Sequence, residues 1–144
     1  MTHEYAGHYG AKHPAGTTYD PALAAALEER AADDRITCAA AFDVAESFRV
    51  APLEVGKTAD LLELRIIKCR LGLFGYAPEK RIVRPAEHVP DDLRERLLGA
   101  VVDGRISCKA CWEIAETLGL EKTAVSGACE ALGLKVGLCQ LGAF

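Results

Sequence analysis

The sequence carries an internal repeat, in which residues 33–74 align with residues 103–144 without a gap. The offset is 70 positions (103 − 33), and identical residues recur along the whole alignment. Identical pairs include Arg35 and Arg105, Cys38 and Cys108, Ala45 and Ala115, Leu62 and Leu132, Cys69 and Cys139, Leu71 and Leu141, and Phe74 and Phe144. A common register of this length is hard to obtain by chance, so the sequence predicts a duplicated module.

The length of each copy limits how it can be stable. A module of about 50 residues is near the size at which a lone hydrophobic core becomes marginal, so we expect the two copies to pack against each other or against a partner. The division that follows is a flexible N-terminal arm at 1–20, a first module at 21–76, a linker at 77–90 and a second module at 91–144. Three prolines make the linker semi-rigid.

Composition narrows the class of protein. Half of the residues are apolar and 26% are charged, which is typical of a folded chain. No apolar run reaches the roughly 20 residues that cross a bilayer, and the first residues lack the apolar core of a signal peptide. We therefore expect a cytoplasmic protein without a membrane partner, in which the six cysteines are thiols or metal ligands. The net charge of −4 gives no general attraction for nucleic acid.

Apolar periodicity predicts three helices in each copy. The first begins after the N-cap Asp20 with Pro21, and in the second copy Asp91 and Asp92 stand in the same way before the helix LRERLLGAVV. Thr37 and Ser107 stand where an N-cap would open the second helix, which is followed by a short turn and a third helix. The period then changes to that of a strand in LRIIKCRLGLFGY and LKVGLCQLGAF. The sequence therefore predicts a mainly α-helical fold with small β elements.

This order of elements resembles the winged helix-turn-helix family. In the family's motif a small residue packs inside the second helix, a glycine makes the turn four residues later, and an aliphatic residue anchors the third helix. Ala115, Gly119 and Val125 fit these places in the second copy. The first copy has Ala45 but carries Arg49 where glycine is expected. The resemblance covers both copies and implies two tandem winged helix-turn-helix modules with small β-wings.

The resemblance also implies a DNA-binding transcriptional regulator. In the family, outward side chains of the third helix read bases in the major groove, while the wing contacts phosphates. The third-helix candidates are Lys57, Lys122, Thr123 and Ser126. The phosphate-binding candidates lie in the first wing and the linker, and are Arg65, Lys68, Arg70, Lys80, Arg81 and Arg84. The same basic residues also fit a solvated strand edge that resists aggregation.

A second interpretation follows from the glycines of the third helices. Gly56 and Gly127 occupy outward positions and cannot read bases. A glycine there costs about 1 kcal/mol relative to alanine, which makes sense if another backbone must approach closely. This pattern is typical of a protein interface. It favours a non-enzymatic interaction subunit, or a redox- or metal-linked accessory subunit, with a protein partner or a second copy of the chain.

The cysteines bear on metal binding, and the absence of catalytic motifs bears on enzymatic activity. Cys108 and Cys111 form a CxxC, but Ala41 replaces the second cysteine in the first copy. We interpret the thiols as buried packing residues, with a metal or iron–sulfur site at Cys108, Cys111 and Cys139 as the alternative. The sequence has no phosphate-binding glycine loop, no His-Glu-x-x-His and no evident Ser/His/Asp set. We therefore expect no enzymatic activity and no cofactor.

Overall fold

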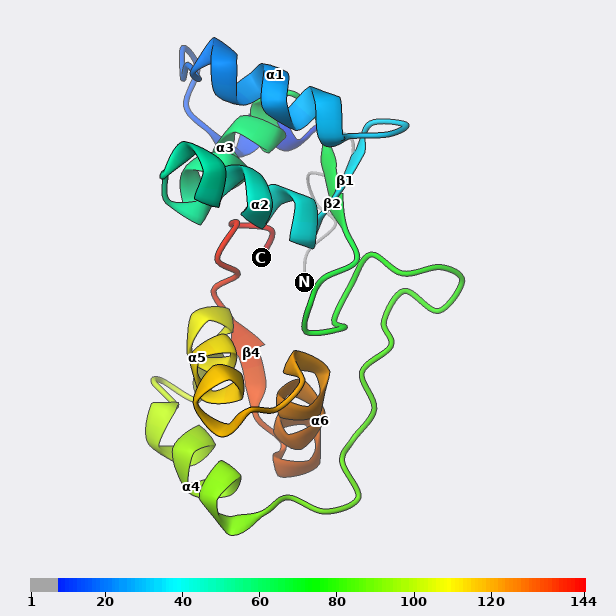
Figure 1. Ribbon diagram of the computed structural model, residues 1–144, viewed down its shortest axis with the longest axis vertical. Coiled ribbons are helices and arrows are strands. Elements are labelled where there is room, and N and C mark those ends of the chain that lie inside the picture. The colour runs from blue at the N-terminus through cyan, green and yellow to red at the C-terminus, as the bar shows by residue number, and fades with distance from the viewer. Residues whose placement is uncertain (1–7) are drawn as a thin grey trace. The chain divides into compact units, whose positions relative to one another are not determined.

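The computed structural model describes residues 8–144, and the chain divides into two compact units (Figure 1). Unit 1 contains Met1–Cys69 together with Gln140–Phe144, and unit 2 contains Arg70–Cys139. Residues 70–76, which the sequence boundaries place with the first module, thus belong to unit 2. Residues 140–144, placed with the second module, belong to unit 1. Of the arm expected at residues 1–20, the first seven residues lie outside the described part.

The helices and strands follow the same order in both units. In unit 1 they are η1 (Tyr9–Lys12), α1 (Pro21–Arg30), β1 (Arg35–Thr37), α2 (Cys38–Phe48), α3 (Pro52–Leu61) and β2 (Arg65–Ile67). In unit 2 they are α4 (Asp91–Ala100), β3 (Arg105–Ser107), α5 (Cys108–Leu118), α6 (Lys122–Leu132) and β4 (Lys135–Gly137). From α1 onward, each element of unit 1 has a counterpart in unit 2 that begins 70 residues later, as Cys108 follows Cys38 (108 − 38). None of the helices in residues 8–144 is long and apolar enough to span a membrane.

Side-chain caps explain where the helices begin. The Asp20 carboxylate accepts a hydrogen bond from the Ala22 N–H at 2.9 Å, and Pro21 occupies the first turn of α1. The Thr37 hydroxyl oxygen accepts from the Ala40 N–H at 3.1 Å. Ser107, its counterpart, accepts from the N–H of Ala110 at 3.1 Å. The predicted N-caps of α1, α2 and α5 are therefore confirmed.

Short turns join the second and third helices of each unit. Gly119 ends α5 and makes the expected turn, with φ 66°, a left-handed conformation that glycine adopts without strain. Arg49 ends α2 with φ 54°, so an arginine adopts the same conformation at the counterpart position. Residues 49–51 and 119–121 thus form equivalent three-residue connections between consecutive helices.

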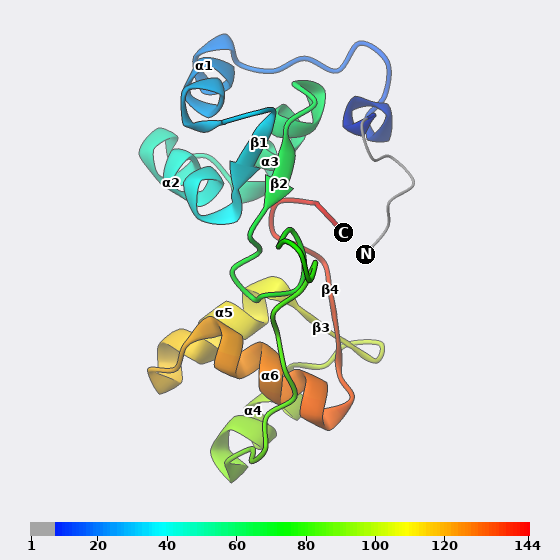
Figure 2. The same cartoon turned by 90° about the vertical axis from the view of Figure 1, so that its right-hand side faces the viewer.

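Each unit has one small parallel sheet (Figure 2). β1 pairs with β2 from Arg35 opposite Arg65, and β3 pairs with β4 from Arg105 opposite Lys135. The strands have only three residues each, whereas the alternating pattern in the sequence extends further. Lys68 follows β2 with φ 53°, and this left-handed residue turns the chain away from the sheet. Within the described residues, the chain after β2 continues through turns and forms no second strand of a hairpin before α4. The fold is mainly α with small β elements.

The core of each unit includes a leucine from the segment that completes it. Leu23, Leu27, Ile36 and Val55 are buried in unit 1. Leu141 joins that unit with only 1% of its surface exposed. In unit 2, Leu97, Ile106 and Val125 are buried, and Leu71 is completely buried. Leu71 and Leu141 are counterparts (141 − 71 = 70), so the two units are completed in the same way.

Candidate functional site

The third helix of unit 1 carries a glycine against the backbone of Leu141. A Cβ atom at Gly56 would overlap the Leu141 carbonyl oxygen. Gly56 lies between the buried residues Val55 and Ala59 on α3, and it is itself buried. Only a residue without a side chain allows this approach. The outward glycine did predict a close backbone contact, and the backbone comes from residues 140–144 of the same chain (Figure 1).

The third helix of unit 2 meets the counterpart leucine through a hydrogen bond. Ser126, the counterpart of Gly56 (126 − 56 = 70), donates its hydroxyl hydrogen to the Leu71 carbonyl oxygen at 2.6 Å. The serine is 1% exposed. A buried hydroxyl needs such a partner, and the carbonyl provides it. We call the surface of α3 around Gly56 and the surface of α6 around Ser126 the two seats.

The occupants of the seats are two short stretches with the pattern Leu-Gly-x-Phe, which we call the LGxF segments (71–74 and 141–144). Each glycine has a positive φ, 76° at Gly72 and 78° at Gly142, where a side chain would be strained. The residue that precedes each segment by three positions is also left-handed, at Lys68 and Leu138. The two segments therefore share a sequence, a backbone conformation and a type of seat.

The linker holds segment 71–74 in place. The N–H groups of Ile82 and Val83 donate to the Gly72 carbonyl oxygen at 2.9 and 3.1 Å. On α6, a Cβ at Gly127 would lie 2.7 Å from the carbonyl oxygen of Arg84. The Ala86 N–H donates to the Gly127 carbonyl oxygen at 2.9 Å. The second outward glycine thus also faces a backbone, in this case that of the linker.

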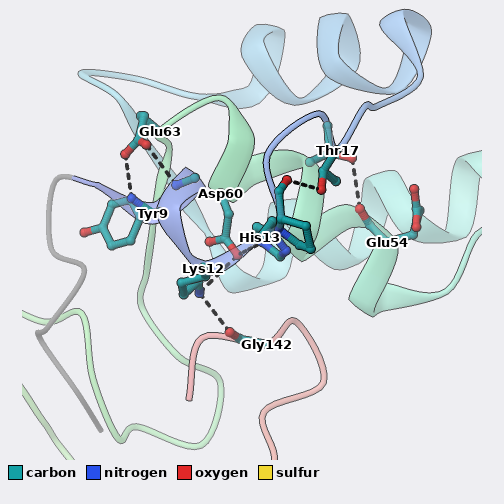
Figure 3. A network of polar contacts seen from close by, with 11 residues as sticks. Tyr9, Lys12, His13, Thr17, Glu54, Asp60, Glu63 and Gly142 are labelled. Atoms are coloured by element: carbon teal, nitrogen blue, oxygen red, sulfur yellow. Dashed lines mark hydrogen bonds and ion pairs between the residues drawn. The ribbon is translucent and has the colours of Figure 1, made fainter.

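In unit 1, residues 9–13 contact α3 and segment 141–144 (Figure 3). They correspond to the linker of unit 2, which contacts α6 and segment 71–74. The Glu63 carboxylate accepts hydrogen bonds from the N–H groups of Tyr9 at 2.7 Å and Gly10 at 2.9 Å. Asp60, on α3, pairs with Lys12 Nζ at 3.0 Å and with His13 Nε2 at 2.9 Å. This part of the expected flexible arm is therefore attached to α3, because a buried carboxylate requires partners of this kind.

Lys12 connects this network to the seat. Its Nζ donates to the Gly142 carbonyl oxygen at 3.0 Å as well as pairing with Asp60 (Figure 3). Unit 2 has a related pair, in which Glu130 of α6 binds Arg81 of the linker. Glu130 is the counterpart of Asp60 (130 − 60 = 70). In both units, an acidic residue of the third helix thus binds a cation from the stretch that precedes the first helix.

Several predicted DNA-binding residues are engaged within the protein. Lys57 pairs with Glu54 at 2.7 Å, and Arg84 pairs with Glu79 at 2.8 Å. Arg81 binds Glu130, and Ser126 is buried under Leu71. Apart from Arg70 and Lys122, the exposed predicted cations that form no ion pair within residues 8–144 are Arg65, Lys68 and Lys80.

Two further predicted cations come together on one aromatic ring. The Arg70 guanidinium carbon lies 5.4 Å from the centre of the Trp112 ring, and Lys122 Nζ lies 4.7 Å from it. Thr123 is exposed and follows Lys122 on α6. We did not predict Trp112, although it is the single tryptophan of the chain and replaces Phe42 at the counterpart position. The structure thus unites one cation from the stretch after β2 with one from α6.

The second copy also has a pair of buried thiols. Cys111 on α5 and Cys129 on α6 are both buried and share a hydrogen bond. This hydrogen bond, together with burial, raises the pKa of Cys111 above 9.0, the ordinary value of the thiol. The thiol is therefore protonated at neutral pH and is a poor nucleophile. The counterparts of these two cysteines in the first copy are Ala41 and Ala59. The joint replacement of two alanines by two cysteines is the sequence signal that would have indicated the pair.

The alternative metal site is not assembled in the part of the chain that the structure describes. Within residues 8–144, no three side chains of His, Cys, Asp or Glu are grouped so that they could hold a metal ion. Cys108 and Cys111 are buried, while Cys139 is partly exposed. The contact that forms instead joins Cys111 to Cys129, a residue outside the proposed ligand set.

The shared feature of both units is a third helix covered by an LGxF segment and braced by the stretch before the first helix. Comparisons of the chain with protein families, with curated proteins and with solved structures find no match. The function therefore has to be inferred from the residues and contacts of this chain.

Proposed function

We propose that the chain is a non-enzymatic interaction protein built from two copies of one winged-helix-type module. In each module the third helix binds an LGxF segment instead of entering DNA. The observation that carries this proposal is the seating of the Leu141 carbonyl at Gly56, repeated by the Leu71 carbonyl at Ser126. Unrelated surface contacts would not place counterpart atoms on counterpart residues in both units.

The same contacts argue against base reading by the third helices. A recognition helix needs its outward face free, because base edges are read by side chains at the groove floor. Gly56, Ser126 and Gly127 are covered by backbone. Exposing the seat would return a buried leucine side chain to water, at a cost of about 1.5–3 kcal/mol. The faces of α3 and α6 are therefore better suited to receiving protein than DNA.

The small size of the segments sets the expected strength of binding. One buried leucine and one or two hydrogen bonds give an isolated segment a Kd of roughly 10⁻³ to 10⁻⁴ M after the costs of association. A short tether provides an effective concentration in the millimolar range. The chain's own segments therefore occupy the seats at rest, and a partner carrying a similar segment has to compete with them.

Peptide binding tests the proposal. We expect a chain that ends at Cys139 to bind an acetylated peptide of residues 140–144, with NMR shift changes concentrated on α3. The control peptide carries Leu141→Asp, which cannot enter the apolar core, and the control receptor carries Gly56→Val. Absence of saturable binding by the first pair at several millimolar peptide would contradict the proposal.

A second candidate function is a DNA-binding regulator that uses phosphate contacts. It is favoured by the cluster of Arg70 and Lys122 on Trp112, with Arg65 and Lys68 exposed. Basic side chains on an acidic protein gain affinity mainly by releasing counterions from DNA.

Salt dependence distinguishes this candidate from the first. If it is correct, fluorescence anisotropy with mixed duplexes should give a log Kd that depends linearly on log salt between about 50 and 200 mM. Removing Lys68, Arg70 and Lys122 together should flatten that slope by about 0.9 for each lost contact. Binding no tighter than about 10⁻⁴ M would eliminate this candidate.

A further inference from the structure

We propose that the seat on α3 accepts residues 141–144 from a second copy of this chain, so that two copies exchange these segments and form a dimer. The inference rests on the proposed function of the seats. It names the partner that the seat fits, which is a copy of the segment that it already holds.

The chemistry of the seat on α3 selects this occupant. The Leu141 side chain is buried, and its carbonyl lies where Gly56 has no side chain. Gly142 has φ 78°, and a Cβ there would lie 3.0 Å from Leu53 Cδ1. Lys12 Nζ binds the Gly142 carbonyl oxygen. A leucine followed by glycine thus satisfies each contact, and the sequence places such a pair at 141–142 in every copy.

The exchange needs no new type of contact. Within one chain, residues 71–74 already complete the unit that contains α6, while residues 141–144 complete the unit that contains α3. Each segment thus follows the strand of one module and fills the seat of the other. Transferring segment 141–144 to a second chain repeats this arrangement between copies. Domain exchange of this kind costs little, because the contacts made and lost are identical.

The two segments differ in how firmly they are held. The Gly72 carbonyl accepts two hydrogen bonds from the linker, which fix segment 71–74 on α6. Within the described residues, the Gly142 carbonyl oxygen accepts its hydrogen bond from a flexible side chain, Lys12. Leu138, which precedes segment 141–144, has φ 55° and is 79% exposed, so it packs little against its surroundings. Segment 141–144 is therefore the one suited to exchange.

A complementation experiment tests the exchange. One chain carries Gly56→Val, which blocks the seat on α3 but keeps segment 141–144. The other ends at Cys139, which removes the segment but leaves the seat open. Each chain alone should sediment as a monomer in reducing buffer. An equimolar mixture at about 1 mM, near the expected Kd of a single contact, should contain roughly tenfold more dimer than either chain alone.

The control is a chain with both Gly56→Val and Leu141→Asp, mixed with the chain that ends at Cys139. This mixture should remain monomeric. A monomeric first mixture, with both chains folded by circular dichroism, would overturn the exchange. If the free peptide still binds the chain that ends at Cys139, the seat itself is retained and only the exchange fails. Failure of both measurements would overturn the proposed function as well.

A second measurement applies if Gly56→Val does not fold. The unmodified chain is unfolded and refolded at about 1 mM, where exchange competes with closure within one chain. We expect a dimer fraction that rises with refolding concentration and that falls at least about fivefold in the Leu141→Asp variant. An equal dimer fraction in both chains, or no dimer at any concentration, would overturn the proposal.

Discussion

The two third helices contact the carbonyl groups of counterpart leucines in different ways. On α3 the residue beneath the Leu141 carbonyl is Gly56, and the backbones touch. On α6 it is Ser126, and a hydroxyl forms a hydrogen bond to the Leu71 carbonyl. The difference shows that the position of the segment is common to both units, while the chemistry that holds it is not. A glycine provides room, and a serine provides a donor.

The residues around the two seats also differ. Asp60 of unit 1 is buried, with 7% of its side chain exposed, and binds Lys12 and His13. Its counterpart Glu130 has 35% of its side chain exposed and binds Arg81. Behind the helices, unit 1 has two buried alanines where unit 2 has Cys111 and Cys129. The leucine carbonyl is therefore held by close packing beside a buried ion pair in unit 1, and by a hydrogen bond beside a partly exposed ion pair in unit 2.

The largest expected effect comes from filling the close contact of unit 1. Gly56→Val should lower the free energy of unfolding by about 3 kcal/mol, because the new side chain overlaps a backbone that cannot move without unseating Leu141. Gly99→Val is the matched control, since a Cβ at this glycine of α4 meets nothing within 4 Å. It should change stability by no more than about 0.5 kcal/mol. Equal losses in urea unfolding would show that the contact at Gly56 does not exist.

The next effect compares the two acidic residues. Asp60→Asn should cost about 2–3 kcal/mol, because it leaves Lys12 and His13 without a buried partner. Glu130→Gln should cost less than about 1 kcal/mol, because a half-exposed pair gains little. Thermal unfolding of both variants measures the difference. A cost for Glu130→Gln that matches or exceeds that of Asp60→Asn would reverse the comparison.

A smaller effect concerns the serine of unit 2. Ser126→Ala keeps the Cβ and removes the donor, so the Leu71 carbonyl loses its hydrogen bond in a buried place. We expect a loss of about 1–2 kcal/mol in urea unfolding. Ser126→Gly copies the residue of unit 1 and should cost about 1 kcal/mol more, because glycine is unfavourable in a helix. An Ala variant as stable as the original chain would mean that the hydroxyl does not hold the segment.

The smallest effect is the pH dependence from the thiol pair. The folded pKa of Cys111 is raised above 9.0 by the hydrogen bond to Cys129 and by burial, so the folded protein retains this proton more strongly than the unfolded chain. Its contribution to stability is therefore complete below pH 9 and is lost as the pH rises further. Relative to a chain with both Cys111→Ala and Cys129→Ala, the original chain should lose at most about 1.4 kcal/mol per pH unit above pH 9. Parallel stability curves for the two chains would contradict this.

Local features of the fold could be predicted from the sequence. Asp20, Thr37 and Ser107 mark the helix starts because a cap acts over two or three residues. Gly119 marks the turn for the same reason. The strands are shorter than the alternation suggests, because left-handed residues such as Lys68 end them, and an L-residue in that conformation gives no sequence signal as glycine does.

The site could be predicted only in part. Gly56 indicated that a backbone comes close, but the sequence does not say which backbone, since the contact joins residues far apart in the chain. Arg81 was predicted to bind phosphate, yet its partner Glu130 lies 49 positions away. Ion pairs of this range depend on the tertiary fold. The assignment of segments 71–74 and 141–144 to opposite units has the same cause.

The central claim is that segment 71–74 packs on α6 and segment 141–144 packs on α3. Methyl NMR of the leucines tests it most directly. In the Gly56→Val variant, the account predicts that the Leu141 methyl signals move to the positions of an unfolded leucine while those of Leu71 stay in place. In Ser126→Ala, the Leu71 signals should shift and the Leu141 signals should not. If Gly56→Val instead displaces Leu71 and leaves Leu141 unchanged, each segment stays with its own module and the account is contradicted.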